Sequence, residues 1–342
     1  MQAPADRGGT GDLALFRRLT GATIVATFVL IVIGGVVRVS DSGLGCGPAG
    51  SGTDGWPLCG GRALPLLDLN AIIEFTHRAA AGVVAGLILV MAWMVIRRLR
   101  EHRVLFWGSA TAGVLVLVQA VLGGLTVEQN LHAVLVSAHL GLAMLLLGIL
   151  IVLWRCADPS ATAVPGAVEA GRVLRGLAVA APMLVFATIV TGGYVAGTEG
   201  EGRASEPVLG AHLACGQEFP GCVGRFLPFG ESSLIDAQLT HRVFMYLAAI
   251  AVIGLALLAA ARHVRTPAFA IAAVILLAQV LLGALNVWLG KHAGLIVGHL
   301  TVGTLLWATV VYAGLRLLPA PSTVSEARRD RRAAAAVAAA EI

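Results

Sequence analysis

Long apolar stretches alternate with short polar segments along most of the chain. A helix needs roughly 20 apolar residues to cross a hydrocarbon core of about 30 Å, because lipid offers no partner to unpaired backbone groups. Eight stretches reach this length, so the pattern predicts an all-α integral membrane protein. The predicted helices cover residues 19–37, 73–96, 104–127, 132–154, 174–196, 237–261, 267–289 and 292–317.

The charged residues define a topology. The 342-residue chain is 58% hydrophobic and 13% charged, with a net charge of +5 that would point to nucleic acid in a soluble protein. Here the basic residues flank the helices, and we predict no nucleic-acid partner. Most of the 24 Lys and Arg residues lie on the side of the two termini, which the positive-inside rule places in the cytoplasm. No cleavage site follows the first helix, which we expect to be retained.

The two halves of the chain share short motifs, repeated at an interval of about 160 residues. The repeat predicts two tandem pseudo-symmetric four-helix bundles that enter the membrane in the same sense, with any symmetry axis along the membrane normal. Gly34-Gly35 recurs as Gly192-Gly193, Thr76-His77-Arg78 as Thr240-His241-Arg242, Gln119 with Gly123 as Gln279 with Gly283, and His139-Leu140 as His299-Leu300.

This repeat sets the predicted domain organisation. A cytoplasmic segment (1–18) precedes the first bundle (19–155), whose large outer loop is 38–73. A cytoplasmic linker (156–173) leads to the second bundle (174–317), whose outer loop is 197–236. We expect the Ala- and Arg-rich tail (318–342) to be disordered or loosely helical in the cytoplasm.

Four of the nine histidines lie within predicted helices, where polar groups are costly and usually functional. They occupy equivalent places on the second and fourth helix of each half, toward the outer end: His77, His139, His241 and His299. Two facing helices that each supply one imidazole form the arrangement for bis-histidine haem ligation. The alternative is an interior histidine that only bonds a neighbouring helix.

Each of the neighbouring polar residues has two or more alternative roles. His132 and His292 stand two turns before His139 and His299. They are competing ligands, hydrogen-bond partners of a haem edge, or residues that merely start a helix. Arg78 and Arg242 follow their histidines and either pair with a haem propionate or snorkel to the headgroups. His102, His212 and His263 are expected to be solvated.

One position separates the halves chemically. Glu74 lies three residues before His77, on the same helical face, whereas the matching residue before His241 is the uncharged Gln238. A carboxylate beside a membrane-embedded haem can donate or accept protons. The first half is therefore predicted to be reactive and the second inert, unless Glu74 is only a solvated helix-start residue.

Four of the five cysteines fall in the outer loops, one pair per half. The outside of a cell permits disulfides, and pairing within one loop needs no long-range docking. We expect Cys46–Cys59 and Cys215–Cys222, either as structural staples or, for the first pair, as a redox-active disulfide near the reactive haem. Zinc is less favoured, since neither loop has the ligand spacing of a closed tetrahedral site.

Three runs in the first half together resemble the haem A synthase family: residues 34–46 (GGVVRVSDSGLGC), Trp56-Pro57-Leu58-Cys59 and Glu74-Phe75-Thr76-His77-Arg78. Thr191-Gly192-Gly193, Leu239-Thr240-His241-Arg242 and Val297-Gly298-His299-Leu300 extend the resemblance to the second half. In that family the two cysteines usually stand closer together, whereas residues 47–55 lengthen the gap here.

The resemblance implies an oxidoreductase that converts the C8 methyl of haem O to the formyl group of haem A. Two hydroxylations would give a geminal diol that loses water. By similarity, His77, His139 and Arg78 would bind the substrate haem, His241 and His299 would ligate a haem b that relays electrons, and Glu74 with Cys46 and Cys59 would lie nearest the chemistry. It also implies a bacterial plasma membrane location, a haem O synthase and terminal-oxidase assembly factors as candidate partners, and an unidentified electron partner.

Two other classes of protein compete with this interpretation. A di-haem b cytochrome that only carries electrons, for instance from quinol, would use the same four histidines but leaves the unequal halves unexplained. A transporter would fit the tandem repeat, yet no helix is broken by paired Gly and Pro at mid-membrane in both halves. Pro182 lies inside the fifth helix alone.

Overall fold

The computed structural model describes residues 7–65, 67–158, 171–199, 210–264, 266–290 and 292–317. Within these ranges every α-helix is long and apolar enough to cross a membrane, and there are eight of them. They are α1 (Arg7–Val39), α2 (Leu69–Arg98), α3 (Arg103–Glu128), α4 (Ala133–Cys156), α5 (Gly171–Gly197), α6 (Ser233–Ala261), α7 (Ala268–Trp288) and α8 (Ala293–Leu315). Short 3-10 helices η1 (Ser42–Leu44), η2 (Gly52–Asp54) and η3 (Ala211–Leu213) lie in the outer loops.

The predicted all-α membrane class is confirmed, and each predicted span coincides with one helix. The outer loops are shorter than predicted because polar caps start α2 and α6 early. Asp68 accepts the backbone N–H of Ala71 at 3.0 Å, and Ser232 accepts that of Ile235 at 3.2 Å. The predicted tail and most of the predicted linker fall outside the described residues.

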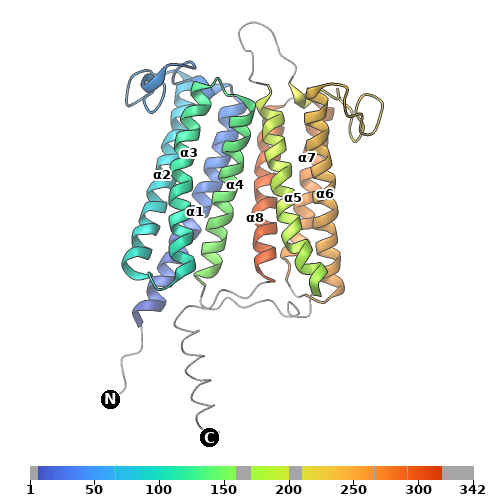
Figure 1. The fold of residues 1–342 in the computed structure, drawn as a ribbon. Helices are drawn as coiled ribbons and strands as arrows, with labels where there is room; N and C mark the ends of the chain where they lie inside the picture. Colours follow the sequence, from blue (N-terminus) through green and yellow to red (C-terminus); the bar gives the residue numbers. More distant parts are fainter. Residues whose placement is uncertain are drawn as a thin grey trace, which may run out of the picture.

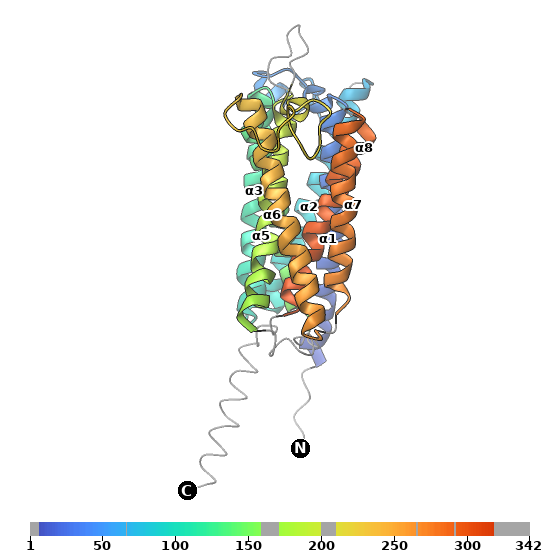
Figure 2. The ribbon, with the colours of Figure 1, turned by 90° about the vertical axis from the view of Figure 1, so that its right-hand side faces the viewer.

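Helices α1–α4 stand on one side of the molecule and α5–α8 on the other, all running between the same two ends (Figure 1). The loops that carry the cysteines lie at one end, and α1 begins and α8 ends at the other. The side view shows the helices as an upright bundle (Figure 2). Contacts of α4 with α5, of α1 with α8 and of α4 with α8 join the two sides. The pseudo-symmetry of the two bundles stays a prediction.

The interior packs through apolar side chains and close helix approaches. One cluster centres on residues of α2, α3 and α4 such as Ile88 and Met91, and a second centres on α5 to α8 but includes Met144 of α4. Trp307 of α8 donates its indole N–H to the carbonyl of Met144 at 2.9 Å. Because lipid tails are as apolar as leucine, such packing and interhelical bonds hold membrane helices together.

Candidate haem-binding and redox site

The four helical histidines lie on α2, α4, α6 and α8, and each ring rests against a glycine of the preceding helix. A Cβ atom built on that glycine would crowd Cε1 of the imidazole at three of the four positions and would just touch it at Gly123. The distances are 3.1 Å from Gly34 to His77, 3.5 Å from Gly123 to His139, 2.8 Å from Gly192 to His241 and 3.0 Å from Gly283 to His299. The glycines therefore make room for an imidazole between two helices, a role the sequence signalled only by repeating them.

The ring nitrogens suit a metal ligand. Nδ1 of His241 lies 2.9 Å from the carbonyl of Thr188, so its N–H can donate there and leave Nε2 for iron. The rings of His77 and His299 likewise make backbone hydrogen bonds, to Leu30 and to Gln279. A second hydrogen bond of this kind fixes the orientation of an imidazole that binds a metal through its other nitrogen.

The histidines interact in pairs. His77 lies within electrostatic range of His139, and His299 within that of His241. Among the residues that the structure describes, no three His, Cys, Asp or Glu side chains gather as a metal site. A haem needs only two axial ligands from the protein, because the macrocycle supplies the others. The residues present therefore fit one haem iron in each half.

Glutamines of α3 and α7 contact the same histidine helices. Gln119 donates from Nε2 to the backbone carbonyl of His139 at 3.0 Å. Nε2 of Gln279 lies 3.3 Å from Nε2 of His299. The second contact touches the ring nitrogen itself, so this amide would have to turn aside for the ring to bind iron through Nε2.

Glu74 joins α2 to the first outer loop. Its side chain is buried, with 3% of the residue exposed, and Oε2 accepts the backbone N–H of Cys46 at 2.7 Å. Oε1 accepts a hydrogen bond from the Arg78 guanidinium, which also donates to the carbonyl of Leu58 at 2.8 Å. The alternative of a solvated helix-start glutamate is wrong, because both carboxylate oxygens are bonded inside the protein.

Close approach of the loop to α2 depends on glycine. A Cβ on Gly45 would lie 2.4 Å from the carbonyl carbon and oxygen of Asn70, and backbone cannot yield as a flexible side chain can. The missing side chain lets the loop settle on the start of α2. This contact brings the Cys46 N–H to the Glu74 carboxylate.

The structure contains the two predicted disulfides, Cys46–Cys59 and Cys215–Cys222. All four cysteines are buried beneath the outer loops. The second cysteine of each loop exchanges backbone hydrogen bonds with an arginine three positions on, Arg62 in the first loop and Arg225 in the second. Both loops are thus compact units, and the first one lies directly on the Glu74 carboxylate.

The second half replaces this carboxylate arrangement with an amide. Gln238 is buried and donates to the carbonyl of His212 at 3.4 Å. Arg242, only 2% exposed, donates to the carbonyls of Gly221 at 2.5 Å and Glu218 at 2.9 Å. Arg242 therefore anchors its outer loop instead of snorkelling, as Arg78 anchors the first.

The remaining histidines differ from one another. His132 and His292 are exposed N-cap residues of α4 and α8, consistent with the helix-start interpretation. His212 was expected to be solvated, but its Nε2 lies 3.4 Å from the carbonyl of Asn286. His212 also lies within electrostatic range of His241 and His299, because η3 folds down over the second half.

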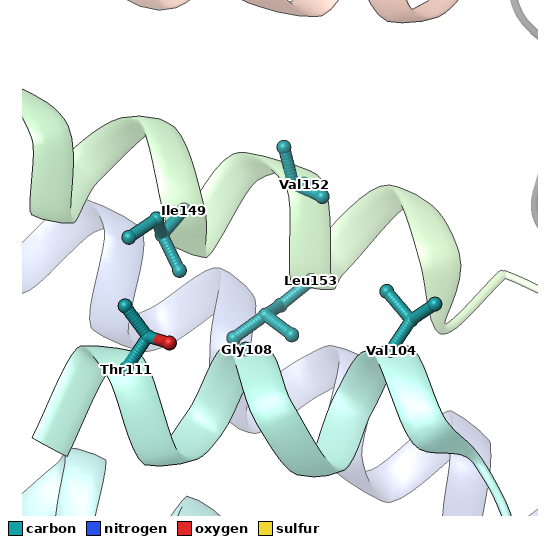
Figure 3. A pocket seen from close by; sticks show the side chains of 6 residues that line it. All are labelled: Val104, Gly108, Thr111, Ile149, Val152 and Leu153. Carbon is teal, nitrogen blue, oxygen red and sulfur yellow. The ribbon is translucent and has the colours of Figure 1, made fainter.

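A cavity of about 170 Å³ opens between α3 and α4 (Figure 3). Its lining is almost wholly apolar: Val104, Gly108, Thr111, Ile149, Val152 and Leu153. Val152 lies roughly 20 Å along α4 from His139 at 1.5 Å per residue. This cavity is therefore not part of the histidine sites.

Fold and site define a class: multi-pass helical membrane proteins that carry paired interior histidines beneath disulfide-bearing outer loops. Within this class, the chain belongs to the COX15-CtaA family of cytochrome oxidase assembly proteins, whose family model matches residues 17–311. The haem A synthase resemblance seen in the motifs is thereby confirmed.

Curated relatives carry a more specific name. The chain is 29% identical over 237 residues to "Heme A synthase" of Halalkalibacterium halodurans, which covers 68% of this chain and 71% of the relative. It is 28% identical over 231 residues to "Heme A synthase" of Shouchella clausii, covering 66% and 70%. A shorter match, 31% over 135 residues, joins it to "Heme A synthase" of Bacillus licheniformis and covers 38% and 42%.

Proposed function

We propose that this chain is a haem A synthase, an oxidoreductase that converts the C8 methyl group of haem O to a formyl group by successive hydroxylations. The names of its relatives support the reaction. One observation carries the proposal for this chain: a buried carboxylate, Glu74, joins the histidine helix α2 to the Cys46–Cys59 loop, while the matching Gln238 is uncharged. Only the first half has a proton-exchanging group in this place.

The two halves then divide the work. His77 and His139 bind the substrate haem O, and His241 and His299 ligate a haem b cofactor. Bound haem b supplies a one-electron redox centre. Support comes from the backbone hydrogen bonds that orient three of these rings: His241 on Thr188, His77 on Leu30 and His299 on Gln279.

Glu74 and its neighbours supply the local chemistry. As the geminal diol loses water, Glu74 would give a proton to the departing hydroxyl and take the proton of the remaining hydroxyl, so that the residue ends in its starting state. Arg78 balances the negative charge of Glu74 and holds the loop through the Leu58 carbonyl. The Cys46–Cys59 disulfide, bonded to Glu74 through the Cys46 N–H, would be reduced to two thiols by an external dithiol, which supplies two electrons and two protons and becomes a disulfide.

The proposed membrane location and topology rest on the distribution of basic residues and on the bacterial relatives. The chain is a multi-pass membrane protein, and its named relatives are bacterial. We place it in the plasma membrane with both termini in the cytoplasm, beside a haem O synthase and the assembly factors of a terminal oxidase. A phosphatase reporter that is active only outside the cytoplasm should be silent when fused after residue 342 and active when inserted in the second outer loop.

The decisive test is the haem content of membranes. The chain is expressed with a haem O synthase in a host that lacks haem A, and extracted haems are identified by mass. Haem A or its hydroxylated precursor is the expected product, and a His77→Ala/His139→Ala double variant serves as the control that should yield neither. Haem b alone, despite abundant haem O and a di-haem spectrum, would contradict the proposal and favour an electron-transfer cytochrome.

A further inference from the structure

Each double glycine of the repeat touches both halves of the molecule. On α1, a Cβ on Gly34 would lie 3.1 Å from Cε1 of His77, in the same half. The next residue, Gly35, faces the opposite half, where its Cβ would lie 2.6 Å from Cδ2 of Leu300 on α8. Leu300 directly follows His299. Adjacent glycines thus border a histidine of one half and a histidine helix of the other.

The glycine pair of α5 makes the reciprocal contacts. A Cβ on Gly192 would lie 2.8 Å from Cε1 of His241, in its own half. A Cβ on Gly193 would lie 3.1 Å from Cδ2 of Leu140, which follows His139 on α4 of the first half. The crossing therefore occurs twice, at the α1–α8 and the α4–α5 contacts.

The surrounding interface limits how far these helices can move apart. Ser137 of α4 donates to the carbonyl of Val190 on α5 at 2.6 Å. Arg38 donates to the carbonyl of Ala196 at 2.7 Å, which joins the outer ends of α1 and α5. Protein interiors are close-packed, so a methyl group added at such a contact displaces a neighbour.

We propose that Gly35 and Gly193 are positioning residues. By letting α1 approach α8 and α5 approach α4 closely, they hold the histidine pair of each half at a fixed distance and orientation relative to the pair of the other half. The proposal rests on the proposed function for its purpose, since electrons must pass between two groups held in constant relation. The predicted contacts do not depend on that function: a change at Gly35 acts on His299, and a change at Gly193 acts on His139.

The prediction is a crossed effect. In Gly35→Ala, the new methyl would lie 2.6 Å from Cδ2 of Leu300, so the Leu300 side chain must take another rotamer and repack beside the neighbouring His299. The milder Gly193→Ala contact at 3.1 Å needs a displacement of only a few tenths of an ångström and acts on Leu140. Gly294→Ala on α8 and Gly82→Ala on α2 are matched controls, because a Cβ there meets no heavy atom within 4 Å in the described part of the chain.

Nitrogen-15 NMR of histidine-labelled full-length protein in bilayers measures this without any haem. The His299 and His139 signals are assigned by their loss in His299→Gln and His139→Gln, using protein from haem-depleted cells. Gly35→Ala should shift the His299 imidazole signals, and Gly193→Ala those of His139, while both controls leave them in place. The double variant Gly35→Ala/Leu300→Ala should return the His299 signals toward the parent positions.

Haem-loaded protein gives a second readout. Gly35→Ala should alter the electron paramagnetic resonance g-values of the haem b held by His241 and His299, and Gly294→Ala should not. The inference is overturned if Gly35→Ala shifts only His77, if Gly294→Ala shifts His299 equally, or if removing Leu300 gives no relief. Should Gly35→Ala fail to fold, Gly193→Ala and Leu300→Ala decide the question alone. If the purified parent protein contains no haem b, the proposed cofactor is wrong. The NMR measurement on haem-free protein then still tests whether Gly35 acts on His299.

Discussion

Replacing Glu74 separates its chemical role from its structural one. In Glu74→Ala the Cys46 N–H loses its acceptor, at a cost of about 1–3 kcal/mol, and Arg78 is left as a largely buried charge. Breaking a buried ion pair in this way destabilises a protein by about 3–5 kcal/mol. Glu74→Gln also removes the charge that pairs with Arg78, but its one amide oxygen can still accept the Cys46 N–H, so it loses one hydrogen bond fewer than Glu74→Ala.

The two variants should therefore differ in stability and agree in chemistry. Removing a general acid or base lowers a rate about 10²–10⁴-fold, so both should form almost no haem A in the co-expression assay while keeping haem b. Both should unfold at a lower temperature than the parent, and Glu74→Ala at the lowest, because it loses the hydrogen bonds to both Cys46 and Arg78. The matched change in the other half, Gln238→Ala, should still form haem A.

Either outcome can refute part of the reasoning. Normal haem A formation by Glu74→Gln would show that the carboxylate exchanges no proton in the reaction. Parent-like thermal stability of Glu74→Ala would show that the bonds to Cys46 and Arg78 do not hold the loop on α2.

Two further predictions concern the cysteines and the glycine cradles. Cys46→Ser/Cys59→Ser should abolish haem A formation, retain haem b and cost about 3 kcal/mol in loop entropy, as measured by haem analysis and thermal unfolding; unchanged haem A would show a purely structural staple. Gly283→Ala should lower haem b content, because its methyl would lie 3.0 Å from the His299 ring. Gly123→Ala, whose methyl would lie 3.5 Å from the His139 ring in the first half, should leave haem b at the parent level. Equal haem b in both variants would contradict the argument that these glycines make room for the imidazoles.

Helix number and position were predictable because a bilayer imposes one strong rule on sequence. Every spanning stretch must be long, apolar and helical, so all eight spans were visible. The ends of α2 and α6 were less visible, since Asp68 and Ser232 extend these helices with polar residues that hydropathy assigns to loops. Local capping decided those boundaries.

The candidate site was predictable in its residues and not in its contacts. The repeat singled out the four histidines, and the difference between Glu74 and Gln238 marked one half as chemically distinct. The disulfide partners followed from their confinement to one loop each. The burial of Glu74 between Cys46 and Arg78 did not follow, because a hydropathy pattern places it near the surface.

The sequence by itself determined the membrane class, the repeated motifs and which ionisable residues are candidates for the site. Each of these depends only on composition and spacing along one chain. Only the tertiary structure decided which groups meet. His212 folds over the second half, the first loop settles on α2 through Gly45, and Gly35 reaches Leu300 across the interface. These contacts join residues far apart in sequence, and helix packing, which depends on all eight helices at once, brings them together.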